Sequence, residues 1–399
     1  MKTQRCYAQR RVQVRRSKRL AAVTLSLTAL LLLTGCWDIK NIQDMNYVTS
    51  IGFDYADNEY RVYVQMLDFI SVAKVESGKP SQHVPVWVGT GKGATVIEAV
   101  NDLYQTSQVR VFYGQVSSIV VSERVMNKGL RDIQELQNRY YELRFTPWVF
   151  GTTMPIDKLF AVTPLFHLSP IISLLHQPME SYRQKSTITP ITSREFITNY
   201  NEPDQVVLLP SIRATAERWK QDTSPHEVLD INGAFVYQDG QYQGWLSERK
   251  LIGLRWIDPK TSRSPLVVYR DGQPEAAVSL EAPKIQIRPI VKGNSAAYEV
   301  SVKLSGNISD IVRAIKETEL EAEVAARVRN EIRETFVNGL QINSDLLQLQ
   351  HTLYRTNNKE WKRLKREGNL KLMPDSLADI RVDVQLNNAG KLKYPAASR

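Results

Sequence analysis

Apolar and polar residues alternate along several stretches of the chain, and this period of two predicts β-strands. The alternation is clearest at residues 60–67, 298–305 and 380–386, with a shorter match at 285–287. Such stretches put apolar side chains on one face and polar side chains on the other, which is typical of a sheet with one solvent-exposed face. The run 116–121 is mostly apolar and predicts a buried strand.

Other stretches carry apolar residues at the helical period. Thr95 and Glu98 have the spacing of a capping box and predict a helix that begins there. A second helix is expected over about 130–143, and a long one over 309–339, closed by the glycine at its end. The long helix carries an apolar row at intervals of four that winds around its axis: Leu320, Val324, Val328, Ile332, Phe336 and Leu340. This row predicts either a helix curved over its own sheet or one packed against two surfaces, and core packing is favoured over a partner-binding face.

Glycine and proline mark the breaks between these elements. Residues 71–93 are expected to form an exposed loop, and Asp239-Gly240 between two apolar runs predicts a β-hairpin. The glycines at the end of the loop flank Lys92, but a phosphate-binding loop needs Ser or Thr after the lysine, and Gly93 stands there. Nucleotide binding is therefore not expected.

These elements predict an α+β protein with mixed or antiparallel sheets and packed helices, arranged as three successive α/β domains. The expected boundaries are a leader at 1–35, an N-terminal domain at 36–195, a small middle domain with the hairpin at 196–265, and a C-terminal domain with the long helix at 266–399.

The leader has the parts of a secretory signal: a basic region without acidic residues, a short apolar segment from Leu20 to Leu33, and small residues at the end. Because Leu33-Thr34-Gly35 is followed by Cys36, the signal is of the lipoprotein type, in which the thiol takes a diacylglyceryl group and Cys36 becomes the new N-terminus. An uncleaved signal-anchor helix is the alternative, but the segment is shorter than the ~20 residues that cross a bilayer. Twin-arginine export is a further alternative, suggested by paired arginines but lacking the usual flanking residues.

Removing the leader changes the charge balance. The whole chain carries a formal charge of +10, but the leader holds eight of the 52 Lys and Arg residues and none of the 42 Asp and Glu residues, which leaves a net charge of +2. A nucleic-acid-binding protein would keep its basic excess on the folded part, so nucleic acid is excluded as a partner. Cys6 leaves with the leader and Cys36 is lipidated, so no disulfide is expected.

No catalytic pattern is found. The histidines at 83, 167, 176, 226 and 351 lack metal-ligand spacing, and there is no Gly-x-Ser-x-Gly motif, so neither a metal site nor a cofactor is expected. A pair of carboxylates placed by the fold, as in a glycosidase, stays open. The basic run around Trp361 could meet anionic lipid, but a solvated helix face with Trp361 and Leu364 turned inward is favoured.

Several stretches together resemble the Ger(x)C lipoproteins, the C subunits of the nutrient germinant receptors of endospore-forming bacteria. The resemblance covers nearly all of the mature chain in the expected order. It departs from the family at Asn41, where an acidic residue is common, and at Gln115, where a histidine is common. The matching stretches are 35–39, 48–54, 93–103, 116–129, 233–256, 343–346 and 361–362.

The resemblance implies a non-enzymatic subunit of three α/β domains, anchored by an N-terminal lipid such as palmitate to the outer face of the cell membrane, which is the inner membrane of the spore. It implies two membrane-spanning partners, the A and B subunits, in a receptor that responds to small nutrients, without implying which subunit contacts the nutrient. Only Cys36 carries a functional role over from the family. Two rival functions are an extracytoplasmic solute-binding lipoprotein, whose two similar lobes are not evident here, and a wall-modifying enzyme with paired carboxylates.

Overall fold

The computed structural model describes residues 24, 26, 45–67, 85–140 and 142–387. The chain divides into two units, Met1–Met45 and Asn46–Arg399, and the elements described below build the second unit. Cys36 and the predicted leader, apart from residues 24 and 26, lie outside the described residues, so the predictions for them stay predictions.

The first sheet has ten strands, and eight of them follow the order β10-β9-β8-β6-β5-β1-β2-β3. The central neighbours β1 and β5, β5 and β6, and β6 and β8 are parallel, whereas the flanking pairs are antiparallel. β4 pairs with β1, and β7 pairs with β6. The strands are β1 (Met45–Ala56), β2 (Glu59–Leu67), β3 (Val86–Gly93), β4 (Arg110–Phe112), β5 (Ser118–Ser122), β6 (Trp148–Thr152), β7 (Ile191–Thr192), β8 (Val206–Gln221), β9 (Ser224–Gln238) and β10 (Gln241–Ser247).

Helices cover both faces of this sheet because successive residues of its strands point to opposite sides. Apolar side chains of α3, α5 and α8 pack with Ile51 and Phe53 on one face, and those of α6 pack on the other, where Gly52 lies against Ile156. The helical segments are α3 (Val96–Tyr104), α4 (Glu123–Lys128), α5 (Arg131–Arg139), α6 (Ile156–Ala161), η2 (Leu165–His167), η3 (Pro170–Ile172), α7 (Pro178–Gln184), α8 (Ser193–Tyr200) and η4 (Ile252–Trp256).

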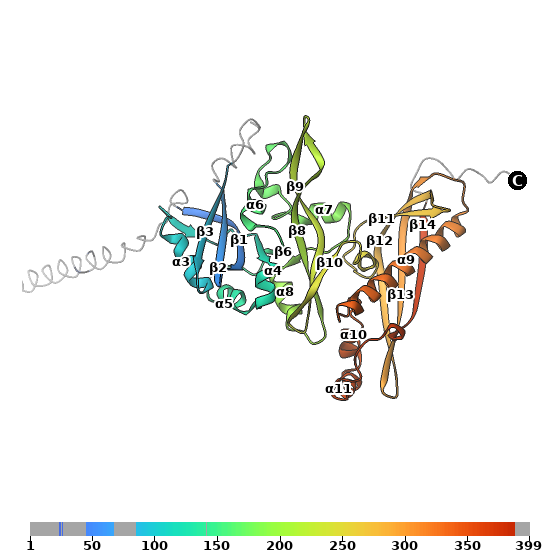
Figure 1. The fold of residues 1–399 in the computed structure, drawn as a ribbon. Helices are drawn as coiled ribbons and strands as arrows, with labels where there is room; N and C mark the ends of the chain where they lie inside the picture. The colour runs from blue at the N-terminus through green and yellow to red at the C-terminus, as the bar shows by residue number, and fades with distance from the viewer. Residues whose placement is uncertain (1–23, 25, 27–44, 68–84, 141, 388–399) are drawn as a thin grey trace, which may run out of the picture. The chain divides into compact units, whose positions relative to one another are not determined.

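The second sheet has the order β11-β12-β13-β14, with antiparallel pairs except for the parallel pair β13 and β14. The parallel pair is joined by a helical crossover, and Figure 1 shows its longest helix, α9, running beside the sheet. The elements are β11 (Ser264–Arg270), β12 (Gln273–Lys292), β13 (Ser295–Ile311), α9 (Glu317–Gln341), α10 (Leu349–Thr356), α11 (Asn358–Arg366), η5 (Pro374–Ser376) and β14 (Leu377–Asn387).

The prediction of an α+β protein with mixed sheets and packed helices is confirmed, and its regular elements form two sheets. The hairpin at Asp239-Gly240 is present as β9 and β10, and these strands with β8 extend the first sheet. The predicted boundaries near 195 and 265 stay predictions. The apolar row of α9 is buried from Leu320 to Phe336 and contacts both β14 and η4, as expected for a helix packed against two surfaces.

Two predictions about element boundaries are wrong. The long helix begins at Glu317 rather than at Ser309 or Asp310, because the chain there continues β13, whose residue Asp310 is paired with Ala277 of β12. The predicted loop at 71–93 contains a strand in its described part, β3 (Val86–Gly93), although glycine disfavours strands. Its glycines allow α3 to lie close, since a Cβ on Gly91 would stand 2.1 Å from the carbonyl oxygen of Ala99.

Candidate functional site

The predicted lipidation site, Cys36, lies outside the described residues. In the part of the chain that the structure describes, no helix is both long enough and apolar enough to span a bilayer. The described residues also form no group of three His, Cys, Asp or Glu side chains suited to a metal ion. The described residues also include several buried polar groups.

His176 is one such group, and its contacts are structural. Its Nδ1 lies 2.6 Å from the hydroxyl of Ser117, and its Nε2 lies 3.1 Å from the side-chain oxygen of Gln65. Burial lowers the pKa of His176 to about 4, so the imidazole is neutral near neutral pH. A neutral ring that accepts from Ser117 and donates to Gln65 has both nitrogens satisfied, which identifies a core histidine rather than a metal ligand or a base.

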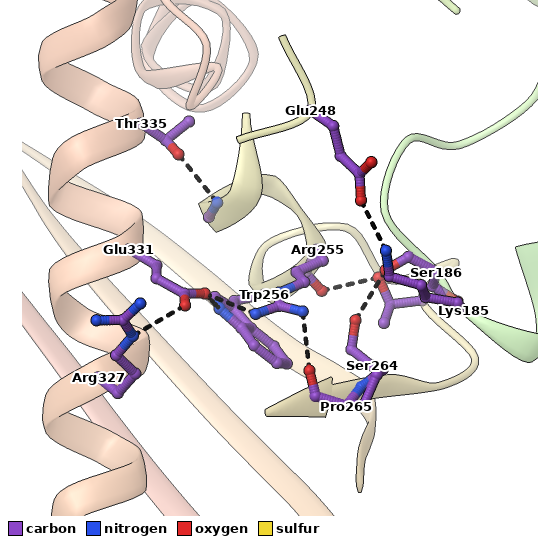
Figure 2. A network of polar contacts seen from close by, with 12 residues as sticks. Lys185, Ser186, Glu248, Arg255, Trp256, Ser264, Pro265, Arg327, Glu331 and Thr335 are labelled. Carbon is purple, nitrogen blue, oxygen red and sulfur yellow. Dashed lines mark hydrogen bonds and ion pairs between the residues drawn. The ribbon is translucent and has the colours of Figure 1, made fainter. Parts of the chain in front are cut away.

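Glu331 of α9 is the centre of a second buried group, shown in Figure 2. Its Oε2 accepts hydrogen bonds from Arg255 at 2.9 Å and from the indole nitrogen of Trp256 at 2.7 Å, and its Oε1 pairs with Arg327 at 3.2 Å. The Arg255 and Glu331 side chains are only 6% and 4% exposed. The guanidinium of Arg255 also stacks on the Trp256 ring and donates to the carbonyl of Pro265. We call these four residues, 255, 256, 327 and 331, the Glu331 network.

The backbone of η4 lies directly against α9 beside this network. The amide of Gly253 donates to the Thr335 hydroxyl at 2.9 Å, and Thr335 is fully buried. A Cβ on Gly253 would stand 2.3 Å from the carbonyl oxygen of Glu331, so only glycine fits at this distance. The segment that leaves the first sheet is thereby fixed to the main helix of the second.

Ser186 joins the same region to the loop after α7. Its hydroxyl accepts from the amides of Ser262 and Arg263, and its carbonyl accepts from the hydroxyl of Ser264, as Figure 2 shows in part. Nearby, Lys185 pairs with Glu248 at 2.9 Å. The segment between η4 and β11 is therefore held in place by backbone and side-chain contacts.

A third group of contacts joins the start of β8 and the end of β9 to the turn after α9. The side chain of Gln348 accepts from the amide of Val206 and donates to the carbonyl of the same residue. Gln238 at the end of β9 accepts from the amide of Asp345 and donates to Gln350. Because each of these side-chain amides uses its donor and its acceptor at once, the contacts favour one arrangement of the strand ends relative to the turn after α9.

Two carboxylates lie within this third group. Asp204, just before β8, accepts from the indole nitrogen of Trp361 and pairs with Lys365 of α11. Asp345 is 1% exposed, and burial raises its pKa to about 7. Burial raises the pKa of Asp204 as well, although its contacts to Lys365 and Trp361 oppose the change. The carboxylate oxygens of Asp204 bind Trp361 and Lys365 of α11. These contacts do not support Asp204 as one of the two catalytic carboxylates of a wall-modifying enzyme.

The predictions for α11 are confirmed. Trp361 and Leu364 point inward and are buried. Within the basic run, Arg363 pairs with both Glu360 and Glu367, so part of its charge is neutralised on the helix itself.

Sequence reasoning missed Glu331 because a glutamate on a long helix is normally solvated. Its position was the available signal, since it directly precedes Ile332 in the buried row and Thr335 follows it by one helical turn on the same side. Arg255 and Trp256 gave no comparable signal, because their partner is 76 and 75 residues away.

Comparisons with known proteins match almost the whole body of the chain. Residues 38–214 match the family described as spore germination protein N-terminal domain, and residues 232–390 match the family described as spore germination B3/GerAC-like, C-terminal. Spore germination protein KC of Bacillus subtilis (strain 168) is 21% identical and covers 93% of this chain and 96% of its own length. Spore germination protein B3 of the same organism is 23% identical and covers 70% of this chain and 72% of its own length.

A solved structure, described as the crystal structure of the GerBC protein, aligns with a TM-score of 0.49 at 16% identity over 85% of this chain and 97% of that chain. The two family matches follow each other along the sequence and leave only short segments uncovered. The chain belongs to the GerAC/GerKC-like family of spore germination proteins, the C subunits of germinant receptors.

Proposed function

We propose that this chain is a lipid-tethered, non-enzymatic subunit of a nutrient germinant receptor, which acts by protein–protein contact beside two membrane-spanning partners, the A and B subunits. The observation that carries the proposal is the combination of C-subunit family membership with Cys36 directly after Leu33-Thr34-Gly35. The leader at 1–35 would be removed and Cys36 would carry the lipid on the outer face of the membrane.

A lipid tether would hold the subunit at the membrane surface and near its partners. Two acyl chains, at ~0.8 kcal/mol per buried methylene, hold a protein durably to a bilayer where one chain does so only marginally. Confinement to the membrane surface raises the concentration of the subunit near its partners, much as a covalent linker does. Contacts of modest strength would then be enough to keep the receptor assembled.

The buried polar groups support a role without catalysis. Several of the buried charged groups, among them Glu331, Asp204 and Arg255, are bonded to other parts of the same fold. Such groups stabilise one arrangement of the two sheets, which suits a body that presents a fixed surface to partners.

The test compares Cys36→Ala with Cys6→Ala in spores. Cys6 lies in the leader and would be lost on processing, so it is the matched control for a cysteine change. We expect Cys36→Ala to release the protein from the membrane fraction and to slow nutrient germination, while Cys6→Ala leaves both unchanged. Normal germination with the protein fully released would show that the tether is not needed and would refute the mechanism.

A further inference from the structure

A cavity lies where α8 and the start of β8 meet the segment after η4. Its volume is about 320 Å³, which is within the ~300–1,000 Å³ usual for small-molecule sites. Its walls come from both sides of the contact region described above, since Val206 and Leu208 belong to the first sheet, and Leu346 and Gln348 follow α9. A molecule bound here would touch segments that the Gln348 contacts already hold together.

The floor of the cavity is apolar. It is lined by five aliphatic residues: Ile188, Val206, Leu208, Leu254 and Ile257. Burying a branched aliphatic group against such a surface is favourable by about 25 cal/mol per Å² of apolar area removed from water. The floor therefore suits a short aliphatic chain.

The rim of the cavity carries one cation with donors to spare. Among the described residues, the ammonium of Lys260 contacts only Glu195, at 2.9 Å, and the Lys260 side chain is 55% exposed. An ammonium has three N–H donors, so it can bind a second acceptor without leaving Glu195. Asn199 and Gln205 also line the cavity, and no hydrogen bond joins the side-chain amide of either residue to another described residue.

The two carboxylates of the rim, Glu195 and Asp258, already accept hydrogen bonds from groups of the same fold. Burial would raise the pKa of Glu195, but Lys260 and the amide of Thr192 outweigh this and hold it below its usual value. The same carboxylate caps α8 through Thr192. Asp258 accepts from the amide of Lys260 and from the hydroxyl of Thr189. Lys260 and the side-chain amides of Asn199 and Gln205 have unused donors, and a carboxylate on the ligand can accept from them.

We propose that this cavity binds a short-chain aliphatic carboxylate, with its branched chain on the apolar floor and its carboxylate on Lys260 and the neighbouring amides. An α-ammonium group on the ligand is compatible with the rim but is not required. The inference rests on the proposed function for its biological meaning, since a ligand held between the two sheets would reach the receptor through this subunit.

The experiment is calorimetric titration of the full-length lipidated protein in nanodiscs with four probes: isobutyrate, L-valine, isobutylamine and D-glucose. Isobutyrate and isobutylamine share the same branched chain and differ in the charged group. We expect heat from isobutyrate and L-valine and none from isobutylamine or glucose. Binding of isobutylamine as tight as that of isobutyrate, or no binding of isobutyrate, would overturn the proposal.

Two variants test the location. Lys260→Met keeps the aliphatic stem and removes the charge, and its matched control is Lys185→Met, whose lysine also pairs with a glutamate at 2.9 Å at similar exposure but does not line the cavity. A hydrogen bond to a charged group is worth ~1.5–3 kcal/mol, so Lys260→Met should weaken isobutyrate binding about 10- to 100-fold while Lys185→Met leaves it unchanged. Equal effects of both variants would refute the site.

A third variant, Asn199→Phe, fills the cavity from a partly exposed position on α8 and should abolish binding without unfolding the protein, as checked by circular dichroism. The binding result is separate from that of the tether. If isobutyrate binds but Cys36→Ala spores germinate normally, the proposed function fails and the site stands; if the Cys36 result holds without binding, only the site is refuted.

Discussion

Glu331→Ala offers the sharpest test of the idea that buried polar contacts hold the two sheets together. The substitution leaves the guanidinium of Arg255 and the indole N–H of Trp256 buried without their acceptor. Removing one partner of a buried ion pair costs about 3–5 kcal/mol, because the remaining charge is left desolvated. The free energy of unfolding should fall by that amount.

Arg327→Ala is the matched control. Arg327 contacts the same carboxylate, but its side chain is 59% exposed, and solvent-exposed ion pairs contribute about 0–1 kcal/mol. Glu331→Gln should lie between the two, because an amide keeps the shape and one acceptor but loses the charge. The double variant Arg255→Met with Glu331→Leu should cost less than the sum of the single changes, since it removes both buried charges together.

The assay is urea denaturation followed by tryptophan fluorescence, in which Trp256 is itself a reporter of the Glu331 network. The midpoint is read at constant m, so that a change in stability is separated from a change in exposed surface. If Glu331→Ala costs no more than Arg327→Ala, the buried pair does not hold η4 on α9 and the reasoning is wrong.

Three further predictions follow from single contacts. Because burial raises the pKa of Asp345 to about 7, the folded protein keeps a proton that the unfolded chain releases, so the free energy of unfolding should fall as pH rises from about 4 to about 7. Asp345→Asn should remove this slope in urea titrations at several pH values. His176, whose pKa is lowered to about 4, contributes an opposite slope, which cancels in the difference between wild type and variant. Gly91→Val should destabilise the protein by about 1–3 kcal/mol because its side chain meets α3, whereas Thr90→Ala on the exposed side of β3 should change the thermal midpoint little. Trp361→Phe should cost about 1–3 kcal/mol in urea denaturation, because it takes a donor from the buried carboxylate of Asp204.

The regular elements were largely predictable because their signals are local. The alternation at 298–305 and 380–386 gives β13 and β14, Asp239-Gly240 gives the turn between β9 and β10, and the buried row gives α9. Each of these depends on residues a few positions apart, so the sequence contains the whole signal.

The two boundary errors have one cause, which is tertiary pairing that overrides local preference. Ser309 and Asp310 favour a helix start, yet the pairing of Ala277 with Asp310 extends β13 past them. The glycines of β3 favour a loop, yet pairing with β2 and the close approach of α3 make glycine the residue that fits. In both places the deciding partner is distant in sequence.

The candidate sites were less predictable than the fold. The Lys260 rim depends on Glu195, 65 residues earlier, and Asp204 finds its partner Trp361 157 residues later. Neither pair has a spacing that a motif could carry, because the fold alone brings the partners together. The proposed lipid-attachment sequence at Cys36 is different, because a signal peptidase would meet it as a linear segment, so its signal is local.

The placement of polar groups gives a physical reason why the two sheets keep one arrangement. Apolar packing tolerates small shifts, whereas the bidentate contact of Gln348 with Val206 and the hydrogen bonds of the Glu331 network depend on direction and weaken when the two sheets shift. The cavity at Lys260 shares a wall with the first of these contacts. A ligand that binds this arrangement more tightly than a loosened one shifts the population toward it. The size of the shift is set by the difference between its two affinities.

Two variants measure the coupling between the cavity and the contact region through their affinity for isobutyrate. Gln348→Ala changes a residue that lines the cavity, whereas Gln350→Ala removes the contact to Gln238 at a residue that does not line it. A fall in affinity in both variants indicates that ligand binding depends on the arrangement of the two sheets. A fall in Gln348→Ala alone indicates only a local contact between Gln348 and the ligand.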